Sequence, residues 1–442
     1  SATCPRWCPG PPRPEPPGGL ILRLDTTTLA ALLAVSFWAG AARDAGAQTA
    51  DIVFGGWTWR LRDVGARPAG LGGAFVAVAD DGRASLLNPA GIALVPNVEV
   101  AAGVGERWAS IALALRGQTR PVSGPPADAA APPIPCPPGP QPRPWTVAFF
   151  AQQSLAHESR LEVVSGPGLV QEGTLSAQRE QVGVTVARGL THWLNLGLSL
   201  NWRHLRMEGA TRLRDAADIE RRRVTLEGDA NKARAVVGLL ATFGPARSPT
   251  AFRLGAAYER DLSAWNVGRR EVDVTAGTVA APATVRIEEP PMLSAGAAWR
   301  INDGWLVTGQ LDYIWYEDVL GGLRHNRADE PEAFRIADGF EPRLGVEHTR
   351  PSPIGGYLKL RAGVRRETVG RLQYVGADLG RTQAFPDVGP AFRGSAGLSL
   401  LAEFYARAAR LDFDLSQVVV ARTSSLSAAG TRRISLSVTV RL

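Results

Sequence analysis

The feature that most constrains this chain is a strict alternation of apolar and polar residues, which recurs from about residue 96 to the end. The clearest case is 194–203, where four leucines and a tryptophan alternate with small or polar residues. Successive side chains of a β-strand point to opposite faces, so this pattern gives one apolar and one polar face. The sequence predicts an all-β fold with 14 strands, over 96–104, 108–116, 145–154, 178–188, 193–206, 232–243, 251–261, 291–301, 304–315, 341–349, 356–366, 392–402, 410–420 and 430–442.

Alternation fits a soluble sandwich as well as a membrane barrel, and the lengths of the connections distinguish the two classes. The connections on one side are short, at 191–192, 244–250, 302–303, 351–355 and 403–409. Those on the other side are long, charged and Gly-rich, at 155–177, 207–231, 262–290, 316–340 and 367–391. Short turns that alternate with long loops on an even number of strands are typical of outer-membrane barrels. We therefore expect a 14-stranded antiparallel transmembrane β-barrel over residues 96–442.

Two places break this order. The turn at 105–107 is short where a long loop is expected, and a Pro-rich insert at 117–144 falls on the side of the short turns. Either the sides are misassigned at the first hairpin, or the chain carries an unusual insert there. The composition of the insert favours a solvated, extended linker.

Aromatic residues support a membrane environment. On the strand that begins at Trp305, one face carries rings at both ends and aliphatic or small residues between them, as interfacial girdles require. That face consists of Trp305, Val307, Gly309, Leu311, Tyr313 and Trp315. The last strand alternates up to Leu442, which resembles the C-terminal signature by which the barrel assembly machinery recognises its substrates, although Phe is the usual last residue there.

The composition excludes several classes of protein. A mean hydropathy of −0.05 with 21% charged residues excludes a disordered chain and a bundle of membrane helices. The net charge is +7, but arginines are spread among 42 acidic residues, so no nucleic acid is expected as a partner. The G-x-S-x-G, H-E-x-x-H, C-x-x-C and P-loop motifs are absent, and the five histidines are scattered, so we expect neither an enzyme nor a metal or cofactor.

The first residues have the features of a leader. Arg23 precedes an apolar run at 29–40, and an Ala-Gly-Ala sequence ends at Ala47. A positive start, an apolar core of about a dozen residues and an A-x-A end are typical of a secretory signal peptide. We expect residues 1–47 to be leader and signal peptide. Cleavage would leave Cys136 without a partner for a disulfide.

The segment 65–94 has a distinctive sequence, GARPAGLGGAFVAVADDGRASLLNPAGIAL. It resembles the N-terminal motif of the FadL-type family of outer-membrane transporters for fatty acids and aromatic hydrocarbons, and equally that of the related PorV-like barrels of protein secretion. The matching positions are Gly70, Gly72, Gly73, Asp80, Asp81, Asn88, Pro89, Ala90 and Gly91. The resemblance implies that residues 48–95 form a hatch, or plug, inside the barrel.

The resemblance also implies passive uptake of hydrophobic small molecules across the cell outer membrane, with the lipid bilayer and lipopolysaccharide as surroundings. The alternative is a PorV-like barrel that docks protein partners, and a barrel enzyme would need a His–Ser or His–Asp pair on the rim. By alternation, the lumen receives basic and acidic side chains that hold the plug, orient a carboxylate ligand or compensate one another's charge in a solvated lumen. These side chains are Lys359, Arg361, Arg365, Asp412 and Asp414.

Overall fold

The main element of the computed structural model is one antiparallel sheet of 17 strands. The sheet closes on itself because β1 (Val98–Val104) pairs with both β2 (Trp108–Leu115) and β19 (Arg433–Arg441). The all-β, antiparallel prediction is therefore confirmed. The structure describes residues 65–95, 98–104, 108–115, 145–164, 170–244, 251–279, 283–317, 334–353, 356–368, 373–376, 390–404, 407–421 and 433–441. The expected leader, the beginning of the expected hatch, the 105–107 turn and the Pro-rich insert lie outside these residues.

The wall continues from β2 to β19 through consecutive antiparallel pairs, and each segment predicted as a strand overlaps one of its strands. The remaining wall strands are β3 (Trp145–Val164), β4 (Val170–Gly189), β5 (Leu194–Arg214), β6 (Glu220–Phe243), β7 (Phe252–Asp261), β11 (Met292–Arg300), β12 (Trp305–Ile314), β14 (Gly339–Pro351), β15 (Tyr357–Glu367), β17 (Ala391–Phe404) and β18 (Arg407–Ala421).

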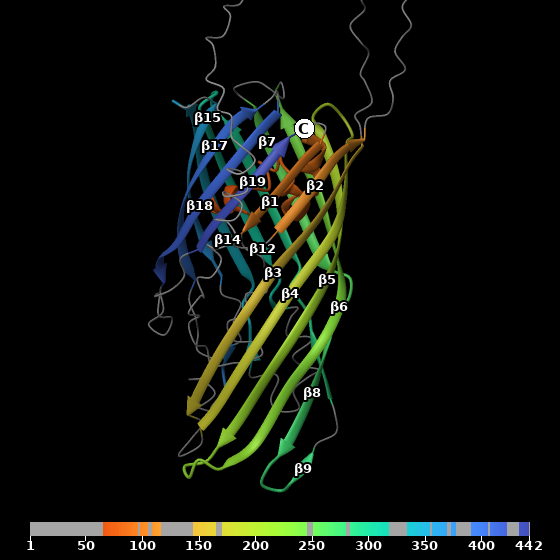
Figure 1. Cartoon of the computed structure of the whole chain (residues 1–442), viewed down its shortest axis with the longest axis vertical. Coiled ribbons are helices and arrows are strands. Elements are labelled where there is room, and N and C mark those ends of the chain that lie inside the picture. Colours follow the sequence, from red (N-terminus) through yellow and green to blue (C-terminus); the bar gives the residue numbers. More distant parts are fainter. Residues whose placement is uncertain are drawn as a thin grey trace, which may run out of the picture.

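The predictions of long loops at 155–177 and 207–231 are wrong. The strands β3 to β6 run through these segments and protrude beyond the rest of the wall (Figure 1). The cause is visible in β5, where the apolar residues change faces: Leu205 and Met207 point inward and are buried, while Arg206 points outward. The polarity of the two faces inverts, but the strand continues.

The expected loop at 262–290 also contains strands. β8 (Trp265–Asp273) pairs with β6, β9 (Thr278–Val279) pairs with β8, and β10 (Ala283–Ile287) pairs with β8. These three strands raise the sheet from the expected 14 strands to 17. Two further short strands, β13 (Phe334–Arg335) and β16 (Gln373–Tyr374), form a separate pair within the expected loops at 316–340 and 367–391.

The outer face of the wall is apolar, as the alternation predicts. On β5, Leu196, Leu198 and Leu200 are 39%, 45% and 47% exposed, whereas Ser199 and Asn201 between and beyond them are buried. The leucines therefore face away from the interior of the protein. Among the described residues, no helix is long and apolar enough to cross a membrane.

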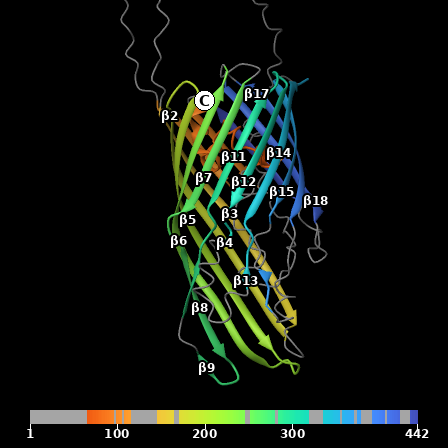
Figure 2. The same cartoon turned by 180° about the vertical axis from the view of Figure 1, so that it is seen from behind.

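The interior holds residues 65–95, which we call the inner segment. It contains two short α-helices, α2 (Ala66–Gly70) and α3 (Ala84–Leu87), and a 3-10 helix, η2 (Pro89–Leu94). Figures 1 and 2 show these elements in orange, enclosed by strands near the end where the chain terminates. α2 lies against β15, β17 and β18, and η2 lies against β4, β5 and β6, so the inner segment spans the lumen.

Candidate functional site

Two groups of aromatic side chains lie on the outer face of the wall, at opposite ends of its apolar region. Near the short turns, the Phe243 ring lies 6.2 Å from the rings of both Trp193 and Phe252. At the other end, the Trp315 ring lies 4.9 Å from that of Tyr313 and 6.2 Å from that of Tyr258. The exposed leucines of β5 lie on the same outer face. Rings at both ends of an apolar region are what two membrane interfaces require.

The glycines of the inner segment permit close approach to the wall. Gly72 and Gly73 have φ values of +66° and +81°, in the left-handed region that other residues rarely adopt. A Cβ atom on Gly72 would lie 2.8 Å from the backbone nitrogen of Val364, and one on Gly70 would lie 3.2 Å from the Cα of Gly397. A Cβ atom on Gly91 would collide with Ala79, so this part of the motif serves the packing of the inner segment on itself.

The wall provides glycines in return. A Cβ atom on Gly345 would lie 2.5 Å from the carbonyl oxygen of Leu71, and one on Gly255 would lie 2.3 Å from that of Val76. Gly197 likewise meets the backbone of Pro89. These glycines occupy inward positions of β5, β7 and β14, where a side chain would exclude the inner segment. They were missed at the sequence level, and the recurrence of glycine at inward positions of successive strands is the signal that could have revealed them.

The two aspartates of the motif are held by arginines. Asp81 accepts hydrogen bonds from Nη1 of Arg83 at 2.8 Å and from Nη1 of Arg67 at 3.2 Å. Asp80 is ion-paired with Arg67, and its Oδ2 lies 3.7 Å from Nη1 of Arg253 on β7. Because Arg67, Asp81 and Arg83 are at most 2% exposed, the centre of this network is inaccessible to solvent, whereas Asp80 and Arg253 are partly exposed.

Asn88 connects two turns of the inner segment with each other and with the wall. Its Nδ2 donates to the carbonyl oxygens of Val76, at 2.7 Å, and of Leu239 on β6, at 3.0 Å. Its Oδ1 accepts a hydrogen bond from the backbone nitrogen of Ala90 at 3.2 Å, which begins η2, with Pro89 as the first helical residue. One amide thereby fixes two turns and one strand of the wall.

The structure places the expected basic residues Lys359, Arg361 and Arg365 at positions of β15 whose side chains are buried or half-buried. Lys359 and Arg361 on β15 both contact Glu347 on β14, at 3.1 Å and 2.7 Å, and Arg67 of the inner segment reaches the same carboxylate at 3.3 Å. Further along β15, Arg365 donates to Glu367 at 2.8 Å. Asp412 and Asp414 lie on β18, but their side chains lie outside the described residues. Glu347 and Arg67 were missed, because nothing in the local pattern pairs residues 280 positions apart.

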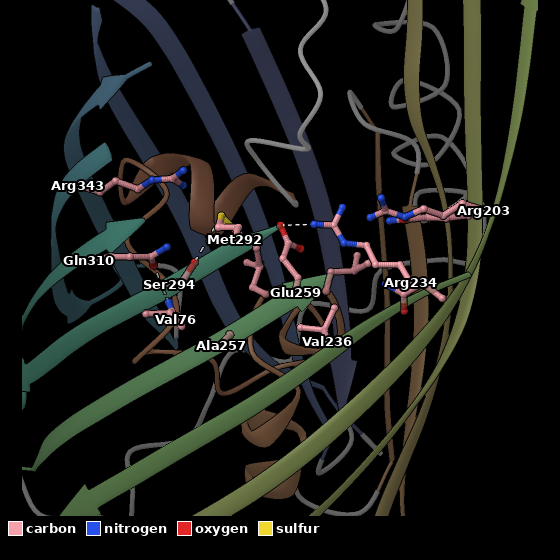
Figure 3. Close-up of a pocket in the computed structure, with 14 residues that line it drawn as sticks. Val76, Arg203, Arg234, Val236, Ala257, Glu259, Met292, Ser294, Gln310 and Arg343 are labelled. Carbon is pink, nitrogen blue, oxygen red and sulfur yellow. Dashed lines mark hydrogen bonds and ion pairs between the residues drawn. The ribbon is translucent and has the colours of Figure 1, made fainter. Parts of the chain in front are cut away.

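A cavity lies between the inner segment and the wall (Figure 3). One side of it is apolar, with Val76, Leu86 and Leu87 from the inner segment. Figure 3 shows the Arg234 side chain directed at Glu259, while Arg343 extends from the opposite side. Apolar and cationic groups therefore meet in one space. The other lining residues are Gln181, Asn201, Arg203, Val236, Ala257, Met292, Ser294 and Gln310.

A cluster of charges adjoins this cavity on the side of the protruding strands. Glu289, in the connection between β10 and β11, is 4% exposed and is ion-paired with Arg179 on β4 and Arg203 on β5. Its Oε2 also lies 3.1 Å from Nη1 of Arg234 and 3.4 Å from Nζ of Lys232, both on β6. Burial acts to raise the pKa of Glu289, but these cations hold that pKa below its ordinary value and keep the carboxylate charged.

A His–Asp pair does lie on the outer face. Nε2 of His204 lies 2.8 Å from Asp229, and its Nδ1 lies 2.9 Å from Oδ1 of Asn231. With both ring nitrogens engaged, neither is available in this arrangement to accept a proton from a nucleophile. Within the described residues, no group of three or more His, Cys, Asp or Glu side chains could hold a metal ion.

Comparison with known proteins identifies the architecture. No protein-family model matches the chain, and no curated protein matches it. The crystal structure of a FadL homologue from Pseudomonas aeruginosa is similar with a TM-score of 0.53 and 11% identity, over 86% of this chain and 99% of that chain. The chain has the FadL-type fold.

Two further structures are similar at lower scores. They are the CymD monoaromatic hydrocarbon channel, with a TM-score of 0.49 at 14% identity over 86% of this chain and 97% of that one, and the P. putida toluene transporter TodX, with 0.49 at 13% over 86% and 98%. The FadL-type fold is the one that the segment 65–94 implied. At these identities the similarity concerns the fold, and the function has to be argued from the site.

Proposed function

We propose that this chain is a FadL-type channel of the cell outer membrane, in which the closed ring of 14 strands crosses the bilayer and residues 48–95 are the hatch. The ring is formed by the wall strands without β8, β9 and β10. Its outward leucines and the two groups of aromatic rings supply the surface that lipid requires. The inner segment fills the lumen, which explains how such a barrel avoids leaking.

The lining of the cavity supports a proposal for the ligand class. Val76, Leu86 and Leu87 offer an apolar surface beside the guanidinium groups of Arg234 and Arg343. These groups are paired with carboxylates of the wall, Arg234 with Glu259 and Arg343 with Asp312 and Glu341, so a ligand carboxylate has to compete for them. A guanidinium binds a carboxylate through charge-assisted hydrogen bonds, whereas an aromatic hydrocarbon offers it only the weaker cation–π attraction of a ring face. This juxtaposition, which carries the proposal, favours amphipathic acids such as long-chain fatty acids over aromatic hydrocarbons as cargo.

The mechanism uses the inner segment as the moving part. An acid enters from the side of the protruding strands, its chain lies on the apolar surface of the inner segment, and its carboxylate is held at the arginines. Passage then requires a local shift of the inner segment, because the lumen is filled at that level. Transport is passive, driven by the concentration gradient of the ligand. The proposal also includes two partners. Lipopolysaccharide surrounds the barrel in the membrane, and the barrel assembly machinery recognises the C-terminal strand.

Uptake distinguishes the ligand classes. Cells with and without the gene are supplied with a labelled long-chain fatty acid or with labelled toluene, and initial rates are compared. We expect the rate for the acid to fall without the gene and to be restored by the wild-type chain. A fall for toluene alone would assign the channel to hydrocarbons, and unchanged rates for both would contradict transport.

Docking of protein partners is the second candidate, because β3 to β6 protrude beyond the apolar belt and offer a surface there (Figure 2). Shortening the β5–β6 hairpin to the level of Trp202 discriminates the two. A docking role predicts loss of partner secretion with uptake unchanged.

A further inference from the structure

The most unusual feature outside the inner segment is a single carboxylate enclosed by four cations. Oε1 of Glu289 is ion-paired with Arg179, and Oε2 is ion-paired with Arg203, Arg234 and Lys232. The cations come from three neighbouring strands, and each is at most 4% exposed. Such convergence is the arrangement by which proteins bind a free carboxylate.

Two further carboxylates among the described residues belong to the cluster. The other acidic partners are Asp261, which pairs with Lys232, and Glu259, whose Oε1 lies 2.6 Å from Nη2 of Arg234. Glu289 is the carboxylate that all four of these basic groups share. Buried cations are stable only when they are paired, so the cluster requires an anion at the position of the Glu289 carboxylate.

Glu289 is carried by a short connection rather than by the wall. It lies between the end of β10 at Ile287 and the beginning of β11 at Met292, in the sequence Glu-Glu-Pro-Pro. Proline nitrogens donate no hydrogen bond to a strand ladder, although the carbonyl oxygen of Pro291 accepts one from the backbone nitrogen of Trp315 at 3.2 Å, next to the beginning of β11. The carboxylate can therefore leave without breaking strand pairs, while the four cations remain fixed on β4, β5 and β6.

The anion site and the cavity share residues. Arg203 and Arg234 line the cavity and also bind Glu289. A carboxylate that enters the cavity consequently competes with Glu289 for the same guanidinium groups.

We propose that Glu289 occupies the binding site of the ligand's carboxylate as an internal stand-in, and that an amphipathic acid displaces it and releases the 288–291 connection. This inference rests on the proposed function, since it names the head-group site of the transported acid. Displacement of Glu289 explains why a channel that is closed by its own ion pairs would open for acids. The carboxylate of the ligand takes the place of the Glu289 carboxylate, so no cation is left buried and unpaired.

The test compares an acid with an alcohol of the same chain. Decanoate and decan-1-ol are bound to the full chain in lipid nanodiscs, with empty nanodiscs as background, and the ratio of their dissociation constants is measured. We expect Glu289→Gln to increase the preference for decanoate by about tenfold or more, because the competing charge is gone. The matched control is Glu288→Gln, whose carboxylate pairs with Arg286 away from the cluster and which should leave the preference unchanged. Arg203→Gln should lower the preference.

An unchanged or reduced preference in Glu289→Gln overturns the inference while leaving transport intact. Absence of binding of both ligands to the wild type and to Glu289→Gln overturns the proposed function as well. Hydrogen exchange of the wild-type chain provides a second measurement that needs no variant. The amides of Glu288 and Glu289 should exchange faster with decanoate bound than with decan-1-ol bound, and equal rates would also overturn the inference.

Discussion

Replacing Asn88 by alanine should loosen the inner segment from the wall. The side chain is fully buried and makes three hydrogen bonds, to the carbonyl oxygens of Val76 and Leu239 and from the nitrogen of Ala90. A net contribution of about 1 kcal/mol for each bond gives about 3 kcal/mol. If the inner segment opens locally with these bonds broken, the open fraction rises roughly 10²-fold.

Ion conductance across planar bilayers measures this directly, because a displaced inner segment leaves a water-filled lumen. We expect brief openings in the wild type to become about 10² times more frequent in Asn88→Ala, with the same unit conductance. Asn302→Ala is the matched control. Asn302 is exposed in the β11–β12 turn, where its Oδ1 accepts hydrogen bonds from the nitrogens of Gly304 and Trp305, at 2.9 Å each. Equal opening frequencies in Asn88→Ala and the wild type would refute the claim that this amide retains the inner segment.

Three further substitutions test the other contacts. Gly345→Ala should expose the inner segment to protease, since the new Cβ would lie 2.5 Å from a backbone oxygen of that segment, whereas Gly309→Ala meets its nearest atom at 3.4 Å and should be tolerated. Leu200→Arg should destabilise the folded barrel in lipid by about 2–4 kcal/mol, measured by urea titration in vesicles. Arg67→Met leaves Asp81 and Glu347 short of a cation and should cost about 3–5 kcal/mol of the free energy that holds the inner segment, measured by its protection from hydrogen exchange.

Each of these three predictions would be contradicted by a specific result. Equal protease sensitivity of the two glycine variants would mean that the wall and the inner segment are not in contact in the membrane. Arg206→Leu is the control for Leu200→Arg. Arg206 lies on the same strand beyond Trp202, and its side chain is 63% exposed. If both changes have equal effects, lipid does not cover the leucines. Unchanged exchange in Arg67→Met would show that the ion pairs do not retain the inner segment.

The strands and their faces were predictable because they depend on neighbours two positions apart. The stretch 194–202 specifies a strand with leucines on one face by itself, and the structure exposes that face. The same reasoning ended strands too early at 155–177 and 207–231. Beyond Trp202 the apolar residues move to the inner face, and a change of polarity is not a change of backbone conformation.

The sequence by itself determined an antiparallel sheet with an apolar outer surface, together with an N-terminal motif that implied the FadL-type fold. Only the tertiary structure decided which charges meet. Arg67 and Glu347 are 280 positions apart in the sequence, and Glu289 and Arg179 are 110 positions apart. The local pattern of residues predicts neither pair. The physical reason is that alternation is imposed by the two environments of one strand, whereas an ion pair across the lumen depends on closure of the sheet and on where the inner segment lies within it.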